Sequence, residues 1–167
     1  MIPIYCPTCG KKLQNKTIGD EGLIPYCLTC QKPWFPQSSY AVIVALINEY
    51  DEILLLNQKQ TSKEYWVLIA GFQKEKERFE DTAIREVYEE TGQHIESLSY
   101  VTSYVHEHKD LILAGFIAYT KMTDIIKSVE VDGYKWIHIS KAKQLLKPDS
   151  IAQKLCIIGE ERWKNKF

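Results

Sequence analysis

The chain has 167 residues, about the length of one typical domain with a small appendage, which excludes a large multidomain protein. Its 21 basic and 22 acidic residues leave a net charge of -1, so it lacks the overall positive field of non-specific nucleic-acid binders. The composition is 45% hydrophobic and 26% charged, which excludes disordered and collagen-like chains and predicts a hydrophobic core.

The first residues do not show the basic start and long apolar stretch of a secretory signal peptide. The longest apolar runs, 41–47 and 111–119, are shorter than the ~20 residues that cross a bilayer. We therefore expect a cytoplasmic protein without a membrane partner. In that reducing compartment its cysteines should be thiols or metal ligands rather than disulfides.

Four cysteines form two Cys-x-x-Cys pairs near the N-terminus: Cys6, Cys9, Cys27 and Cys30. This spacing is typical of a structural four-thiolate zinc site, in which no position stays open for substrate. A redox pair or unrelated buried thiols would not explain two pairs in a segment with few apolar residues. We predict a zinc ribbon over residues 1–33 with bound Zn²⁺, followed by a proline-containing linker over 34–39. Scattered lysines leave nucleic-acid binding open, but more often such lysines are simply solvated.

Residues 40–167 carry the pattern of a second domain. Short apolar runs predict strands, the first two forming a hairpin, at 41–47, 52–58, 66–72, 98–105, 111–119 and 134–139. Runs of helix formers predict helices over 80–91 and 150–163, the first ended by Gly92 in a left-handed conformation. Cys156 lies on the second helix beside its apolar side, where a buried thiol is expected. The order of elements predicts an α+β domain with a mixed sheet between helices.

The first predicted helix places three carboxylates on one face, because Glu86, Glu89 and Glu90 are three and four residues apart. Like charges at these spacings repel, and the C-terminal end of a helix favours cations. A bound Mg²⁺ or Mn²⁺ removes both penalties. For an isolated acidic helix, a solvated face with Lys and Arg partners is the simpler interpretation.

The residues around this helix resemble a family signature, the Nudix box, G-x5-E-x7-R-E-hydrophobic-x-E-E-x-G-hydrophobic. The matching residues are Gly71, Glu77, Arg85, Glu86, Val87, Glu89, Glu90 and Gly92. Two positions depart from the usual pattern: Lys76 stands where many members have Gly, and Gln93 where an aliphatic residue is usual.

The resemblance implies a Nudix fold, with a mixed β-sheet sandwiched between α-helices, over residues 40–167. It also implies a metal-dependent hydrolase that cleaves a nucleoside diphosphate linked to another moiety. Glu86, Glu89 and Glu90 would hold the Mg²⁺ or Mn²⁺, Glu77 would be a further ligand or base, and Arg85 would orient a carboxylate. Glu130 is a candidate for a late acidic residue near the metals, and an exposed loop glutamate is the equal alternative.

The zinc ribbon, the AGF of residues 70–72 and the LAGF of residues 113–116 together are similar to the NADH pyrophosphatase branch of the family. That branch usually carries SQPWPFP after the box, whereas residues 103–109 here read SYVHEHK. NADH or NAD-like dinucleotides are therefore the first expectation for the substrate. ADP-ribose, a nucleoside triphosphate and NAD-capped RNA are the alternatives.

The predicted substrate-binding residues are Phe72, Tyr104 and His106. His106 and its neighbours Glu107 and His108 could contact a base or transfer a proton, but more often such residues line a variable loop that has no chemical role. Relatives in this branch are often dimers, which implies a homodimer. A hypothesis of another class is a catalytically idle Nudix domain that serves as a sensor or nucleic-acid-binding regulator, although such a module has no need of the three clustered glutamates.

Overall fold

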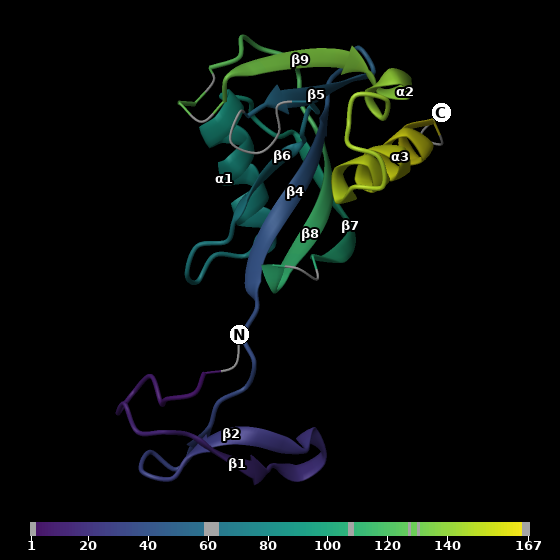
Figure 1. The fold of residues 1–167 in the computed structure, drawn as a ribbon. Helices are drawn as coiled ribbons and strands as arrows, with labels where there is room; N and C mark the ends of the chain where they lie inside the picture. The colour runs from purple at the N-terminus through teal and green to yellow at the C-terminus, as the bar shows by residue number, and fades with distance from the viewer. Residues whose placement is uncertain (1–2, 59–63, 107–108, 127, 130, 165–167) are drawn as a thin grey trace. The chain divides into compact units, whose positions relative to one another are not determined.

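The computed structural model describes residues 3–58, 64–106, 109–126, 128–129 and 131–164 (Figure 1). The chain divides into two compact units, one formed mainly by the residues up to Ser39 and the other by the residues from Tyr40 onwards. Within the described part of the chain, no helix is long and apolar enough to cross a membrane.

The first unit is a small antiparallel sheet of three strands, β1 (Gln14–Thr17), β2 (Leu23–Cys27) and β3 (Lys32–Pro33), with a 3-10 helix, η1 (Gly19–Glu21), between the first two. The sequence pattern did not predict these strands. Among the described residues of this unit, the buried hydrophobic side chains are Cys6, Ile24 and Cys27. Such a small core cannot hold a fold alone, so the cysteines must contribute to its stability.

The second unit is built on a six-stranded sheet. Its strands are β4 (Ser39–Ile47), β5 (Glu52–Asn57), β6 (Ile69–Phe72), β7 (Ser97–His106), β8 (Leu111–Tyr119) and β9 (Gly133–His138). The order across the sheet is β7-β8-β4-β5-β9, and β6 pairs with β4 as well. The predicted strands and the predicted hairpin of β4 and β5 are confirmed.

Strand β4 lies at the centre of this sheet and has partners along both edges. On one edge it pairs antiparallel with β6 through its first half and with β5 at Ile47. On the other edge the Ser39 amide donates to the Asp110 carbonyl at one end, and the Thr120 amide donates to the Ile47 carbonyl at the other end. The two strands β4 and β8 therefore run in the same direction and are parallel. The prediction of a mixed sheet is confirmed.

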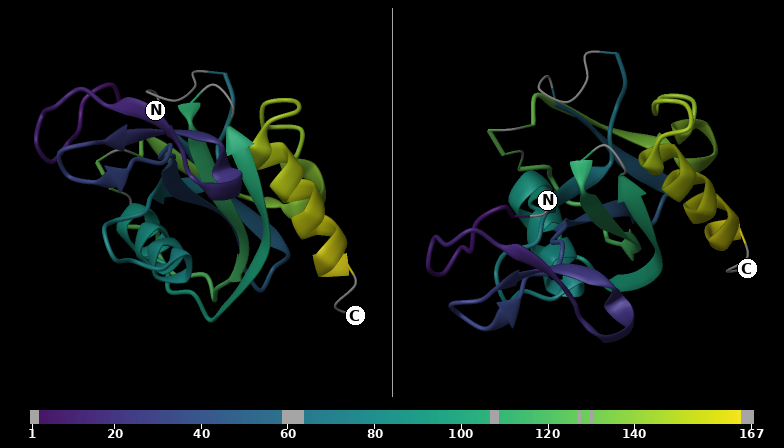
Figure 2. Two further views of the ribbon diagram at one scale, coloured as in Figure 1. Left: turned by 90° about the horizontal axis from the view of Figure 1, so that it is seen from below. Right: turned by 60° about the horizontal axis from the view of Figure 1, so that its bottom comes forward.

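Helices cover both faces of the sheet, as Figures 1 and 2 show for α1 (Phe79–Thr91) and α3 (Ile151–Lys164). Ala83 and Val87 of α1 pack on one face with alternate residues of β4 such as Val44. Leu155 of α3 packs on the other face with Ile43. This alternation is the period-two pattern of a strand buried on both sides. The predicted sandwich is confirmed, and the sequence missed only the short α2 (Ile139–Ala142) among the described helices of this unit.

Two predicted details of the helices are also confirmed. Gly92 ends α1 in a left-handed conformation (φ 71°), and its amide donates to the Tyr88 carbonyl at 2.8 Å. Cys156 is fully buried, and burial raises the pKa of its thiol to about 11, so it is a neutral core residue.

Candidate active site

Strand β6 leads through a short loop into α1; the loop holds Glu77 of the predicted signature, and the helix holds its other acidic residues. Glu86 points back from α1 onto the backbone of Gly71 in β6, with a side chain only 13% exposed. A Cβ atom at position 71 would overlap with the carboxylate carbon and both carboxylate oxygens of Glu86. The glycine is therefore the residue that makes room for this glutamate.

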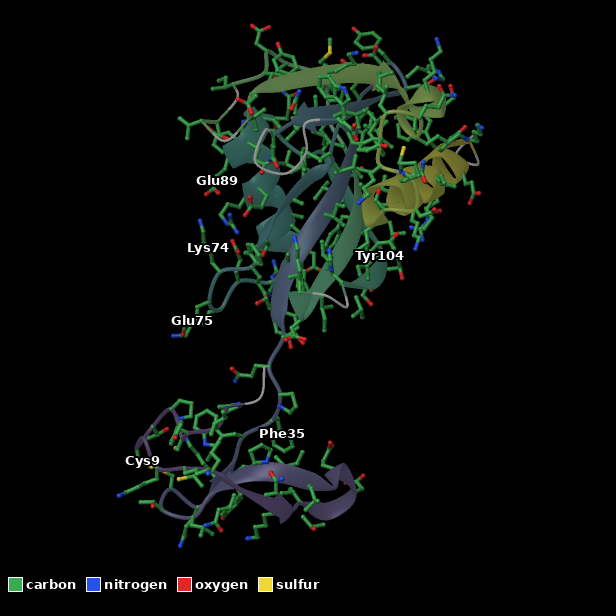
Figure 3. All side chains as sticks on the ribbon, in the orientation of Figure 1. Cys9, Phe35, Lys74, Glu75, Glu89 and Tyr104 are labelled. Carbon is green, nitrogen blue, oxygen red and sulfur yellow. The ribbon has the colours of Figure 1, made fainter. Side chains whose placement is uncertain are left out.

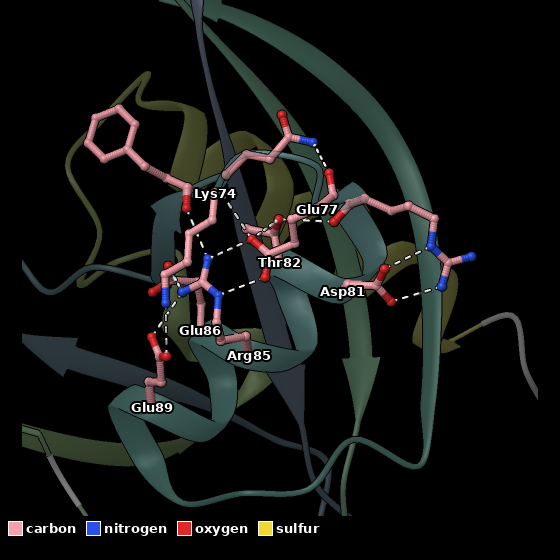
Figure 4. A network of polar contacts seen from close by, with 10 residues as sticks. Lys74, Glu77, Asp81, Thr82, Arg85, Glu86 and Glu89 are labelled. Atoms are coloured by element: carbon pink, nitrogen blue, oxygen red, sulfur yellow. Dashed lines mark hydrogen bonds and ion pairs between the residues drawn. The ribbon is translucent and has the colours of Figure 1, made fainter.

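Arg85 is the centre of the network shown in Figure 4. Its Nε and Nη2 donate to the two oxygens of Glu77 at 2.8 and 2.9 Å. Its Nη1 donates to Glu86 at 2.6 Å and to Glu89 at 2.9 Å, and Nη2 also donates to the Phe72 carbonyl at 3.0 Å. These contacts use all five N–H groups of a guanidinium, so the position of Arg85 is fully determined.

Glu77 fixes Arg85 from the loop. Its carboxylate also accepts hydrogen bonds from the Lys74 amide at 3.0 Å and from the Thr82 hydroxyl at 2.9 Å. The hydrogen bonds from Arg85 lower the pKa of Glu77 to about 2 although burial opposes the shift, and they raise the pKa of Arg85. A carboxylate with so low a pKa accepts protons poorly near neutral pH, so Glu77 is suited to orient Arg85 rather than to act as a base.

The other two carboxylates of the set differ in exposure. Glu89 has a side chain 49% exposed, lies 3.3 Å from Lys74 Nζ, and has its pKa lowered by the hydrogen bond from Arg85. Glu90 is buried and accepts a hydrogen bond from Gln58 at 3.4 Å. The oxygens of Glu86, Glu89 and Glu90 do not form a tight cluster, since the described residues contain one close group of metal-binding atoms and it consists of cysteines.

The type of ligand nevertheless fits a hard divalent cation, because α1 carries three carboxylates spaced three and four residues apart. The missing Cβ of Gly71 gives the Glu86 carboxylate room against the sheet. Arg85 Nη1 takes one oxygen of Glu86 and one of Glu89. The other oxygens are the ones that a metal would use, and they include Glu89 Oε1, which Lys74 Nζ binds in this structure.

The two departures from the family signature have visible consequences. Lys76 adopts φ 64°, the left-handed conformation that glycine adopts without strain. Gln93 is buried and binds the segment that follows β8: its Nε2 donates to the Thr123 hydroxyl at 2.8 Å, and its Oε1 accepts from the Thr123 amide at 3.1 Å. An aliphatic residue could not make these bonds.

The predicted substrate-binding residues do not all lie beside the acidic set. Phe72 is adjacent to it, with an exposed ring and a carbonyl that binds Arg85. Tyr104 packs on the α3 side of the sheet, with its ring against Gly115, and therefore lies on the face opposite α1. His106 is the last residue of β7. Glu130, Glu107 and His108 lie outside the described residues.

Sequence reasoning missed Lys74 as a member of the site. Figure 3 shows its side chain extending on the same side of the unit as Glu89. Nothing in the pattern distinguishes this lysine from others in a charged loop, because the contact depends on how the loop folds back onto α1.

A separate groove of about 430 Å³ runs along the outer side of α1. Its lining residues are Asp81, Ile84, Arg85, Tyr88, Gln93, His94 and Ile95. Since none of the four glutamates lines it, this groove is not the predicted metal site.

The four paired cysteines come together in the first unit, with all four sulfur atoms within 4.8 Å of one another. The Cys6–Cys30 and Cys9–Cys27 sulfur distances are 3.9 and 3.5 Å. A tetrahedral zinc ion with ~2.3 Å bonds requires sulfur atoms ~3.8 Å apart, so the cluster fits a four-thiolate metal site.

Because these thiols lie close together, the pKa values of Cys6 and Cys30 shift in opposite directions. Burial opposes ionisation of Cys6, but hydrogen bonds from the Cys9 and Thr8 amides and from neighbouring thiols lower its pKa to about 6. The side-chain hydrogen bond with Cys9 and burial raise the pKa of Cys30 to about 12. A bound cation would stabilise all four thiolates together.

A comparison with family models matches the NUDIX domain to residues 38–155, which is most of the chain. The chain belongs to the Nudix family. Its fold is similar to that of a NUDIX hydrolase from Nitrosomonas europaea, with a TM-score of 0.71 and 20% identity over 98% of this chain and 93% of that one. It is also similar to the NUDIX domain of Shewanella oneidensis NrtR in complex with ADP ribose, with a TM-score of 0.64 and 17% identity over 85% and 94% of the two chains.

Several curated relatives are named NAD-capped RNA hydrolase NudC. The Haemophilus influenzae protein is 30% identical over 165 residues, which is 96% of this chain and 61% of the relative. The Edwardsiella ictaluri protein is 26% identical over 152 residues, which is 90% of this chain and 58% of the relative. The chain thus spans about six tenths of the length of these relatives. Its similarity to the NADH pyrophosphatase branch is confirmed, and Nudix enzymes use divalent metal ions.

Proposed function

We propose that this chain is a metal-dependent Nudix pyrophosphohydrolase that cleaves the diphosphate of NADH or NAD-like dinucleotides in the cytoplasm. The observation that carries the proposal is the Arg85 network, which fixes Glu86 against Gly71 and leaves further carboxylates of α1 beside it. The names of the NudC relatives support a substrate that contains NAD.

Glu86, Glu89 and Glu90 would hold Mg²⁺ or Mn²⁺. Such an ion, when bound, neutralises the diphosphate and makes a bound water more acidic. The protein supplies the positioning: Glu77 orients Arg85, and Arg85 in turn holds Glu86 and Glu89 in place. This preorganisation limits the rearrangement needed when substrate arrives.

The four cysteines Cys6, Cys9, Cys27 and Cys30 would hold a structural Zn²⁺, because four protein ligands leave no open position. We also propose that residues 1–33 form a zinc ribbon, residues 34–39 a linker and residues 40–167 a Nudix domain, and that the protein is a homodimer. Phe72, His106 and Glu130 remain the proposed additional contacts to substrate or metal, whereas Tyr104 packs on the opposite face of the sheet, away from the acidic set.

NAD-capped RNA is the second candidate substrate, and contacts in the first unit favour it. Lys16 Nζ lies 4.3 Å from the centre of the Tyr26 ring, and Lys32 Nζ lies 4.5 Å from the Trp34 ring. Aromatic rings next to lysines are typical of surfaces that bind single-stranded nucleic acid. ADP-ribose and nucleoside triphosphates remain alternatives, as does an idle sensor.

The test is product analysis with Mn²⁺ and a panel of NADH, NAD⁺, ADP-ribose, nucleoside triphosphates and NAD-capped RNA. We expect cleavage of NADH to nicotinamide mononucleotide and AMP, and loss of that cleavage in Glu90→Gln. Unchanged hydrolysis in Glu90→Gln would contradict the metal assignment. Turnover of a different diphosphate instead of NADH would identify that compound as the substrate. No turnover across the panel would favour a catalytically idle sensor.

A further inference from the structure

Both oxygens of Glu89 are bound by cations. Oε2 accepts a hydrogen bond from Arg85 Nη1 at 2.9 Å, and Oε1 accepts one from Lys74 Nζ at 3.3 Å. Glu89 is also the most exposed glutamate of the network, with a side chain 49% exposed against 13% for Glu86. Glu89 is therefore the carboxylate of the network that can most easily exchange Lys74 for another cation.

The two cations differ in how firmly they are held. Arg85 uses all its donors within the network, and its side chain is 17% exposed. Lys74 has a side chain 62% exposed and makes a single side-chain contact among the described residues, to Glu89. A lysine ammonium on a flexible stem at such a site is held weakly, by roughly 0.2–1 kcal/mol. Lys74 can thus leave Glu89 without disturbing Arg85.

The net charge of the network also favours binding of a divalent cation. Glu77, Glu86, Glu89 and Glu90 supply four negative charges, and Arg85 and Lys74 supply two positive ones, which leaves an excess of two negative charges. One divalent cation balances that excess. If Glu89 turned to the cation, Lys74 would become an unpaired positive charge at the edge of the site, where the anionic diphosphate must arrive.

We propose that Lys74 is an exchangeable cation of this site, which holds Glu89 when no divalent ion is bound and contacts the substrate diphosphate after its release. The contact between Lys74 and the diphosphate rests on the proposed function. The exchange of Lys74 for a divalent ion at Glu89 concerns metal binding alone and does not depend on turnover.

The first experiment is an isothermal calorimetric titration of the whole 167-residue chain with Mn²⁺ in the absence of substrate. Lys74→Met should bind Mn²⁺ about 1.4- to fivefold more tightly, because a competing cation worth roughly 0.2–1 kcal/mol is removed. Lys76→Met is the matched control, since Lys76 is in the same loop but lies near Glu75 at 3.9 Å. Lys76→Met should bind Mn²⁺ as the unmodified protein does.

The second experiment measures KM and kcat at saturating Mn²⁺ with the substrate that the panel identifies. Lys74→Met should raise KM about tenfold, the value of one charge-assisted contact, with kcat changed much less. Lys74→Arg should restore KM, whereas Lys76→Met should leave it unchanged.

Unchanged or weaker Mn²⁺ binding in Lys74→Met would overturn the proposal, and so would equal tightening in both variants, which would indicate a long-range charge effect. Tighter Mn²⁺ binding without a change in KM would overturn the contact to substrate. Absence of turnover in the unmodified protein would refute the proposed function, while the Mn²⁺ titration would still decide the exchange at Glu89.

Discussion

Gly71→Ala should destabilise the second unit by about 2–5 kcal/mol. The added Cβ would overlap with the Glu86 carboxylate, far inside the ~3.5 Å at which carbon atoms begin to repel. Overpacking at such a site costs about 1–3 kcal/mol, and loss of the charge-assisted bond between Glu86 and Arg85 costs about 1.5–3 kcal/mol more. The lower chain entropy of unfolded alanine offsets about 0.4–1 kcal/mol of this.

The assay is guanidinium unfolding at constant Zn²⁺, followed by tryptophan fluorescence. Gly133→Ala is the matched control, because a Cβ there would meet only the Asn57 Cβ at 3.9 Å. That variant should remain within about 0.5 kcal/mol of the unmodified protein. If Gly71→Ala were equally stable, Glu86 would not be seated on the backbone of β6, and our account of the site would be wrong.

Three further outcomes are expected. Lys76→Gly should stabilise the protein by about 0.5–1 kcal/mol in the same unfolding assay, because glycine adopts φ 64° without the strain that a Cβ brings; a loss of stability would contradict this. Hydrogen bonds from Lys164 and Lys143 lower the pKa of the buried Glu160, so the stability it adds is present above its ordinary pKa of 4.5 and is lost as pH falls through the lower folded value. Glu160→Gln should therefore lose less stability between about pH 5 and pH 3, measured as the free energy of unfolding; an identical pH profile would argue against the ion pairs. Removal of zinc by a chelator should unfold the first unit and leave the second intact, measured by limited proteolysis; equal resistance of residues before Ser39 with and without the chelator would refute a structural metal at Cys6, Cys9, Cys27 and Cys30.

The sequence predicted the second unit well, because its main elements bury regular apolar patterns. Strand β4 contains an unbroken apolar run that is buried on both faces, helix α1 has apolar residues at helical spacing, and Gly92 marks a helix end by its backbone freedom alone. The strands of the first unit were missed for the opposite reason. Strand β1 is exposed throughout, and in β2 the two buried residues, Ile24 and Cys27, lie three positions apart, so no period-two alternation exists to detect.

The chemistry of the site was predicted only in outline. The family resemblance indicated which glutamates matter and that Arg85 orients a carboxylate. It could not indicate that Arg85 binds three carboxylates and a carbonyl, or that Lys74 reaches Glu89 across fifteen positions of the chain. The bonds from Gln93 to Thr123 span thirty positions and likewise depend on tertiary structure. Such contacts leave no local signal in a single sequence.

The parallel pairing of β4 with β8 has a consequence for synthesis of the protein. The Thr120 amide donates to the Ile47 carbonyl at the far end of this pair, so β4 emerges from the ribosome about 70 residues before its parallel partner is complete. Its buried apolar residues, such as Val42 and Val44, stay without that partner during this interval. Cys30, by contrast, completes the metal site before β4 has been made. The nascent chain can therefore fold its first unit early. Its Nudix domain can fold only later, once β8 is available to pair with β4.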